Sequence, residues 1–443
     1  MLNNLFTFIL NKIKDKMRHF KYYFLIIFIF TSCELEHPQF QKIDTLFLEG
    51  VKNNKISGAN ALIYKDGKIV YNKSFGTKNP ITKEKYKSDD IFRIASMTKA
   101  VTSLGILILW ERGLLKIDDP IEKYIKEFKG IGILDKFYEK DSTYSIKPTK
   151  KLITIKHLLT HTSGLGYGFI DENSAIRAIF YKEKSSFMKN GVVGFSSDNV
   201  TIGETIKNLA KLPLHHEPGE KWTYGIGIDV LGYLIEIITK KSLNNFFIDE
   251  IFKPIEMNDT YFYLPADKKN KLVPVLTKIN NEWTFLKENR FDIDYPIKGS
   301  KVFYSGGGGL SSTIEDYCKF LSIFLNEGRF KKNQIIQKNT IKLVTEDKLN
   351  GIQKNTSWFS DLGHSLAFEV LRPQDIDKNI GGSAGTISWG GYFNTKFFAD
   401  PKKNIIGILY KQSNSTQGIK DDSLEVHDNF INKKFRKLVF NEF

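Results

Sequence analysis

The chain has 443 residues, of which 41% are hydrophobic and 26% are charged. This balance is typical of a soluble globular protein and excludes a collagen, a coiled coil or a largely disordered chain. The formal net charge of +15 is spread along the sequence as single lysines and short pairs, without an Arg-rich block, so we do not expect nucleic acid as a partner. The two cysteines are too few for a disulfide framework or a thiolate cluster, and we expect neither a metal nor another cofactor.

The first residues are typical of an export signal. A basic segment at residues 18–21 is followed by a short apolar run at residues 22–30, and small residues lead directly to Cys33. The run is too short to span a bilayer, whereas a cysteine after small residues resembles a bacterial lipobox. Phe30 departs from that motif, which usually has Leu at this position. The alternative is an N-terminal helix or an anchor that is not removed.

The sequence therefore predicts a leader at residues 1–32, with Met17 as an alternative start, and one domain at residues 33–443. Neither repeats nor a Pro-rich linker divide that domain. We expect it to be exported to the cell envelope and held at the membrane by a lipid on Cys33.

Strand patterns lie near both ends of the domain, and helical patterns lie between them. Residues 60–76 alternate around an Asp66-Gly67 turn, which predicts a hairpin. A second hairpin is predicted from residues 395–399 and 405–410, which flank a turn-rich loop. The stretches with helical periodicity are Met97–Gly113, Ile153–Leu159, Ile202–Leu212, Ile228–Thr239 and Thr313–Glu327. The pattern favours an α+β fold in which the chain ends supply the strands.

A Ser-x-x-Lys pair, Ser96 and Lys99, is the first candidate for nucleophilic chemistry. On a helix these residues share a face, so the amine can reach the hydroxyl. The segment around them, residues 92–110, is almost wholly apolar, which favours the neutral amine that a serine nucleophile needs as its base. A second match, Ser186 and Lys189, lies in a polar loop and is interpreted as accidental. A helix cap and a lysine that reaches solvent remain the structural alternative for the first pair.

A second candidate serine, Ser383, lies in a Gly-x-Ser-x-Gly segment. Asp400 and His427 follow it in the order of an α/β-hydrolase triad. That elbow requires an apolar strand before the serine and a helix after it, and neither flank has such a pattern. We therefore interpret the segment as a Gly-rich approach to a strand.

Four segments in order resemble the serine β-lactamase superfamily: residues 92–102, 152–165, 217–225 and 305–317. The similarity is to the branch that contains class C β-lactamases, D-alanyl-D-alanine carboxypeptidases and β-lactamase-like esterases. It implies an antiparallel sheet formed by both chain ends and flanked by helices, with a mostly helical region inserted between the strands. This agrees with the α+β pattern read from the elements.

The resemblance also implies roles for individual residues. Ser96 would be the acylated nucleophile and Lys99 its base, while Tyr224 matches the tyrosine of a Tyr-x-Asn motif and would donate a proton to the leaving group. The third motif of the family falls on Trp389, Gly390 and Gly391. The backbone N–H groups of Ser96 and Tyr392 would then form the oxyanion hole.

Two departures from the family pattern bear on the substrate. Ile226 replaces the Asn of the second motif, and Trp389 replaces the Lys or His that helps to hold a carboxylate. Both changes disfavour β-lactams and favour esters or other small acyl substrates. We thus expect a serine hydrolase that acts through an acyl-enzyme on esters.

Other functions stay open at this stage. A D-alanyl-D-alanine carboxypeptidase or β-lactamase acting on a peptide-like substrate is one alternative. A catalytically silent envelope lipoprotein that binds peptidoglycan or a partner is another. The joint presence of Ser96, Lys99 and Tyr224 favours the enzyme.

Two further signals have simpler explanations. His157 and His161 have the spacing of a zinc-protease motif, but the Glu of that motif is absent. The run Gly306–Gly309 resembles a phosphate loop without its Gly-Lys-Ser/Thr ending, and Ser312 with Glu315 predicts a capping box for the helix that follows.

Overall fold

The structure, a computed structural model, describes residues 38–168, 170–183, 199–287, 292–354, 359–414 and 422–443. The predicted lipidation site Cys33 and the pair Ser186 and Lys189 lie outside these residues. Residues 45–443 form one compact unit, and the residues before Thr45 belong to another. The unit of residues 45–443 carries every element described below except the 3-10 helix η1 (Pro38–Phe40) and the first turn of α2 (Gln41–Lys52).

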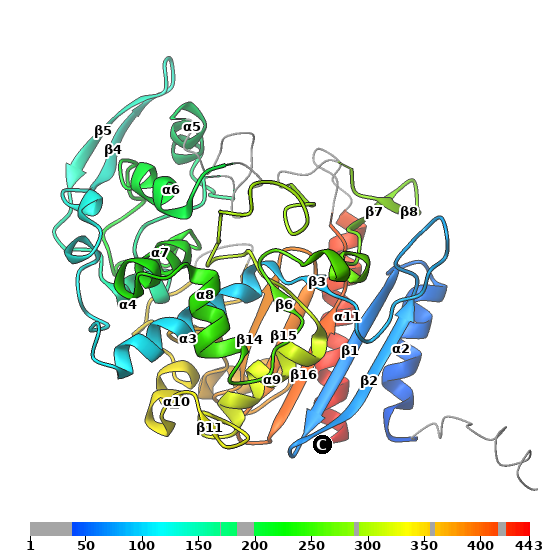
Figure 1. Cartoon of the computed structure of the whole chain (residues 1–443). Helices are drawn as coiled ribbons and strands as arrows, with labels where there is room; N and C mark the ends of the chain where they lie inside the picture. The colour runs from blue at the N-terminus through cyan, green and yellow to red at the C-terminus, as the bar shows by residue number, and fades with distance from the viewer. Residues whose placement is uncertain (1–37, 169, 184–198, 288–291, 355–358, 415–421) are drawn as a thin grey trace, which may run out of the picture. The chain divides into compact units, whose positions relative to one another are not determined.

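The centre of the unit is an antiparallel sheet built from both ends of the chain (Figure 1). Its strand order in the described chain is β12-β13-β14-β15-β16-β1-β2. The hairpin β1 (Gly58–Lys65) and β2 (Lys68–Gly76) comes from the N-terminal side. The strands of the C-terminal side are β12 (Gly363–His364), β13 (Glu369–Val370), β14 (Ile387–Gly391), β15 (Thr395–Asp400) and β16 (Ile405–Tyr410). The two sides join where β1 pairs with β16, with Asn60 opposite Tyr410, so both predicted hairpins and the predicted fold class are confirmed.

Helices cover both faces of this sheet. Phe397 and Phe398 are neighbours on β15 and therefore point to opposite faces. The ring of Phe397 lies 5.3 Å from Tyr317 of α9 (Ile314–Leu325), whereas that of Phe398 lies 5.1 Å from Phe440 of α11 (Asp422–Glu442). Figure 1 shows α9 and α11 on opposite sides of the strands. Strands β1 and β16 are accordingly buried almost throughout.

The middle of the chain forms the mostly helical region that the sequence predicted. Its central helix is α3 (Thr98–Glu111), in which every residue from Thr98 to Leu109 is buried. The other helices of this region are α4 (Ile155–Leu159), α5 (Ser174–Lys182), α6 (Ile202–Leu209), α7 (Gly227–Thr239), α8 (Leu243–Phe247) and the π-helix η6 (Ile248–Phe252). Because a buried helix needs apolar residues on all sides, the apolar run from Leu104 to Trp110 explains the place of α3.

Short elements complete the fold. A small three-stranded sheet has the order β3 (Phe92–Arg93), β9 (Ser311–Ser312) and β6 (Thr260–Tyr261). Three two-stranded hairpins are formed by β4 (Gly132–Tyr138) with β5 (Thr143–Pro148), β7 (Leu276–Ile279) with β8 (Glu282–Phe285), and β10 (Arg329–Phe330) with β11 (Asn333–Gln334). The remaining helices are η2 (Ala95–Met97), η3 (Ile121–Lys123), η4 (Lys126–Phe128), η7 (Ala266–Lys271), α10 (Lys338–Thr345) and η8 (Pro373–Lys378). No helix among the described residues is both long and apolar enough to cross a bilayer.

One local prediction was wrong. The cap of α9 is Thr313, whose hydroxyl accepts the N–H of Asp316 at 3.2 Å, and not Ser312 with Glu315. The hydroxyl of Ser312 is instead 2.7 Å from that of Thr260, because Ser312 belongs to β9. The strand pairing thus moves the start of the helix by one residue.

Candidate active site

Ser96 lies in the short helix η2 that leads into α3. The residue before it, Ala95, has a positive φ of 44° and is fully buried. A side chain in this left-handed region costs about 1–3 kcal/mol and persists only where the surroundings enforce it. The turn leaves Ser96 half-buried between two buried neighbours, Ala95 and Met97. It therefore presents one accessible hydroxyl at the start of an otherwise buried helix.

The three predicted catalytic side chains meet at this hydroxyl. The Oγ atom of Ser96 is 3.2 Å from Nζ of Lys99 and accepts a hydrogen bond of 2.8 Å from the phenol of Tyr224. Lys99 is 2% exposed and also donates to the carbonyl of Gly307 at 2.6 Å. Its Nζ lies 5.0 Å from the ring centre of Tyr224 and 5.4 Å from that of Tyr167. A hydroxyl flanked by an amine and a phenol has the contacts that proton transfer to and from it requires.

Ser383 has a different environment. Its hydroxyl and its backbone N–H both bind the carboxylate of Asp400, at 2.7 Å each. Asp400 also accepts the N–H groups of Lys402 and Lys403, so it stabilises the turn between β15 and β16. The 3-10 helix η8 precedes Ser383 and the strand β14 follows it, the reverse of a nucleophile elbow. The third member of that hypothetical triad, His427, lies outside the residues whose side chains are described.

The Trp-Gly-Gly motif ends strand β14 beside the nucleophile. A Cβ atom on Gly391 would lie 2.3 Å from the carbonyl oxygen of Ile94, so only glycine allows the strand to approach the segment before Ser96 this closely. A Cβ atom on Gly390 would meet only the flexible end of Lys396. Tyr392 follows at once, with a side chain that is 36% exposed. The role of the Ser96 and Tyr392 N–H groups as an oxyanion hole stays a prediction.

Rings from distant parts of the chain surround Tyr224. We call this the aromatic cluster, and its members are His161, Trp222, Tyr224, Phe359, His364 and Trp389. Phe359 lies 4.6 Å from Tyr224 and is nearly parallel to Trp389 at 5.9 Å between ring centres. Trp389 itself is 8% exposed. The packing of these rings fixes the ring that carries the phenol.

Ile226 is buried, at 1% exposure, and comes directly before α7. Its carbonyl accepts the N–H of Asp229 at 2.8 Å. The side chain packs into the hydrophobic core. Contact between Ile226 and a substrate therefore stays a prediction.

Burial also governs the two histidines of the aromatic cluster. The pKa values of His161 and His364 are held well below their ordinary range, first because burial disfavours the charged ring. The ammonium group of Lys354 lowers both further, and that of Lys99 lowers His161. Both imidazoles are accordingly neutral around pH 7.

The structure gives the other predicted features simple local contacts. His157 accepts the backbone N–H of Thr154 at 3.2 Å in a capping box at the start of α4. Among the described residues, no group of three or more His, Cys, Asp or Glu side chains could hold a metal ion. Gly307, from the glycine run that resembled a phosphate loop, instead binds Lys99.

Sequence reasoning missed several residues around the site. Gly307 holds Lys99, and Asp229 in turn holds Gly307 through its backbone N–H at 3.0 Å. The run of glycines was a signal for close packing that could have identified Gly307. Nothing in the sequence indicated that His364 and Phe359 would reach Tyr224 or its neighbours.

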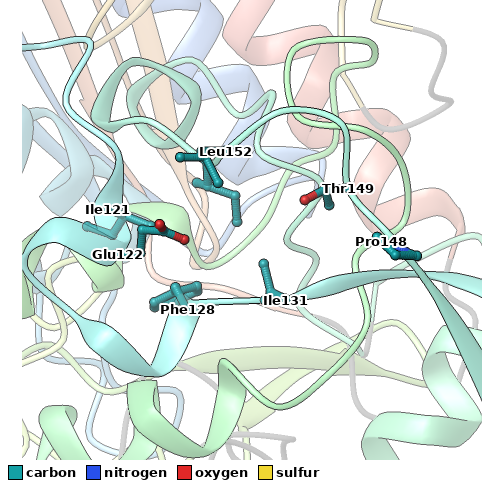
Figure 2. Close-up of a pocket in the computed structure, with 9 residues that line it drawn as sticks. Ile121, Glu122, Phe128, Ile131, Pro148, Thr149 and Leu152 are labelled. Carbon is teal, nitrogen blue, oxygen red and sulfur yellow. The ribbon is translucent and has the colours of Figure 1, made fainter.

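A separate hollow lies in the helical region (Figure 2). Its volume is about 190 Å³ and its lining is mainly apolar, from Ile121, Glu122, Phe128, Gly130, Ile131, Pro148, Thr149, Leu152 and Ile153. None of the residues around Ser96 lines it.

Known proteins are similar to this chain in sequence and in fold. A family model described as Beta-lactamase matches residues 43–428, so the chain belongs to the Beta-lactamase family. Esterase EstB of Burkholderia gladioli is 25% identical over 387 residues, which cover 83% of this chain and 89% of EstB. Lovastatin esterase of Penicillium rubens is 26% identical over 383 residues, with 83% and 91% covered. The solved structure of simvastatin synthase (LovD) from Aspergillus terreus has a TM-score of 0.75 at 20% identity, covers 91% of this chain and 98% of its own, and shows the same fold.

Proposed function

We propose that this protein is an exported serine hydrolase that cleaves carboxylic esters through an acyl-enzyme on Ser96. The observation that carries the proposal is the contact of one half-buried hydroxyl with both Lys99 and Tyr224, at 3.2 and 2.8 Å. Two relatives that are named esterases support the choice of substrate.

The acylation step begins with proton transfer from Ser96. Lys99 in its neutral form takes the hydroxyl proton while Oγ bonds to the carbonyl carbon of the ester. The carbonyl oxygen becomes an oxyanion, which the N–H groups of Ser96 and Tyr392 would stabilise by roughly 3 kcal/mol each. The close approach of Gly391 to Ile94 supports this role, because it brings the end of β14, directly before Tyr392, beside the segment that leads to Ser96.

The intermediate then collapses and expels the alcohol. The bond between the carbonyl carbon and the leaving oxygen breaks, and that oxygen takes the proton of Tyr224, which Lys99 replaces from its ammonium. Water repeats the sequence in reverse roles: it gives a proton to the Tyr224 and Lys99 pair, attacks the acyl carbon and releases the acid. Ser96 recovers its proton and the enzyme returns to its first state.

Esters fit the site better than β-lactams or carboxylate-terminated peptides. The position that would hold a carboxylate is occupied by the indole of Trp389, which packs against Phe359 and His364. An apolar ring cannot offer the charge-assisted hydrogen bond that a carboxylate requires. The alternatives, a D-alanyl-D-alanine carboxypeptidase or a β-lactamase, would need another cation there.

The deciding experiment is hydrolysis of p-nitrophenyl butyrate with labelling by a fluorophosphonate. Ser96→Ala should lower kcat by at least about a thousandfold and abolish the label. Ser383→Ala, the matched control, should retain the activity and the label of the wild type, because that serine binds Asp400 within a turn. An inactive wild type that takes no label would favour the non-catalytic binding protein.

Export and anchoring form the second part of the proposal. They rest on the basic and apolar leader and on Cys33, whose thiol would carry the lipid. Cys33→Ser should move the mature protein from the membrane fraction to the soluble fraction of an expressing bacterium. Unchanged membrane association would instead indicate an anchor that is not removed.

A further inference from the structure

We infer that Asp229 is a positioning residue for Lys99. It holds Lys99 beside Ser96 through the peptide group of Gly307, and its negative charge offsets the positive charge of Lys99 during acylation. The inference rests on the proposed function, since it assigns a role within the same acylation step. It concerns a carboxylate that the sequence did not single out.

The contacts form a continuous path from the carboxylate to the nucleophile. Oδ1 of Asp229 accepts the hydroxyl of Ser305 at 2.6 Å and the N–H of Gly307 at 3.0 Å. The carbonyl of Gly307 accepts a hydrogen of Lys99 at 2.6 Å, and Nζ of Lys99 lies 3.2 Å from Oγ of Ser96. Any movement of the carboxylate therefore moves the group that sets the position of the amine.

The path is fixed on both sides. On one side, Thr102 of α3 donates its hydroxyl to the carbonyl of Gly306 at 2.7 Å. On the other, Asp229 lies in the first turn of α7 and is fully buried. A Cβ atom on Gly307 would lie 2.1 Å from Oδ2 of Asp229, so only glycine leaves room for the carboxylate. The glycine run is thus held between the two helices that carry Lys99 and Asp229.

The charge of Asp229 gives it a role beyond that of a spacer. Its Oδ2 atom is buried and has no hydrogen-bond partner in the described part of the chain. Burial raises the pKa of Asp229, and the charge of Lys99 acts against that rise. Among the described residues, the rings of Tyr167 and Tyr224 also lie next to Lys99, and the charge of Lys99 acts on the neutral ring of His161. When Lys99 takes the proton of Ser96, the negative charge of Asp229, which lies on the other side of the Gly307 peptide group, stabilises the new ammonium.

The test is the dependence of kcat/KM on pH for p-nitrophenyl butyrate. Asp229→Asn keeps an oxygen that can accept from Ser305 and Gly307 but removes the charge. We expect kcat to fall about 10- to 100-fold with little change in KM, as for a lost charge-assisted contact. Because the variant lacks the negative charge that stabilises a positive charge beside Ser96, the acid limb of the profile should move to lower pH by about half a unit or more.

Ser305→Ala is the matched control, since it removes a hydrogen bond to the same carboxylate and leaves the charge. Its acid limb should coincide with that of the wild type. If Asp229→Asn does not fold, Asp229→Ser replaces it, because a smaller side chain places no amide against Gly307. A folded Asp229 variant whose acid limb is unchanged overturns the inference, even if its rate falls.

The outcome for Ser96 separates this inference from the proposed function. If Ser96→Ala retains activity, the acylation scheme itself is wrong. If Ser96→Ala is inactive while both Asp229 variants keep the pH profile of the wild type, the hydrolase remains and only the role of Asp229 is removed.

Discussion

Replacement of Trp389 by Lys tests why the site should prefer esters to β-lactams. The indole is 8% exposed and packs against Tyr224, Phe359 and His364 with ring centres 5.3–5.9 Å apart. Loss of such a ring costs up to about 3–5 kcal/mol of stability, so the total activity of Trp389→Lys should fall. The new ammonium, however, would lie where the carboxylate of a lactam is expected.

The size of the gain follows from one contact. A hydrogen bond between an ammonium and a carboxylate contributes roughly 1.5–3 kcal/mol, or about one to two orders of magnitude in kcat/KM for the substrate that carries the carboxylate. The ratio of kcat/KM for nitrocefin to that for p-nitrophenyl butyrate should therefore rise about 10- to 100-fold. The ratio cancels general damage to the fold, because both substrates use the same Ser96.

Both substrates should be measured on wild type, Trp389→Lys and Trp389→Met. The Met variant has a side chain of similar length without charge, so its ratio should stay near that of the wild type. A wild type that already prefers nitrocefin, or a ratio that rises equally in both variants, would refute the assignment of position 389 as the carboxylate-binding position.

Three further predictions follow from packing and burial. Gly391→Ala should lower kcat for p-nitrophenyl butyrate by about 100-fold or more, because its Cβ would meet the carbonyl of Ile94 and displace the end of β14. Gly390→Ala should lose far less activity, because its Cβ meets only the flexible side chain of a lysine. Similar losses in the two variants would contradict the close approach. The free energy of unfolding, measured in urea, should fall as the pH drops below about 6.5, by up to ~1.4 kcal/mol per pH unit for each buried histidine. The reason is that the unfolded chain takes up protons which His161 and His364 in the folded state do not. His364→Gln should reduce this dependence on pH, and an unchanged dependence would count against a neutral buried ring. Burial raises the pKa of the Cys318 thiol, so Ellman's reagent should modify Cys318 of the Cys33→Ser variant only after unfolding. Rapid modification of the folded protein would show that α9 opens.

Local patterns predicted the parts of the fold that depend on local sequence. The Asp66-Gly67 turn forms the hairpin of β1 and β2, and the three-residue spacing of Ser96 and Lys99 places both groups on one side of the turn that enters α3. The helix α11 was missed although its signal is present. Ile431, Phe435 and Val439 are buried at a helical spacing, but three lysines and an arginine lie between them and weaken the apolar pattern.

The rest of the site depends on contacts between distant segments. Tyr224 and the Trp-Gly-Gly motif were assigned only through the family resemblance, because no local rule brings residue 224 or 391 to residue 96. The link from Asp229 to Gly307 joins a helix to a loop many residues later, and neither residue forms a recognisable motif alone. Such pairs become visible only when the packing of α3 against α7 is known.

The pairing of β1 with β16 also limits when the sheet can form during synthesis of the chain. Asn60 of β1 pairs with Tyr410 of β16, so a ribosome must finish nearly the whole chain before β1 can gain its second neighbour. Until then β1 has an apolar edge with free backbone groups, which is the kind of surface that chaperones protect and that drives aggregation. A premature stop codon anywhere before β16 should therefore yield an insoluble fragment, not a shortened enzyme.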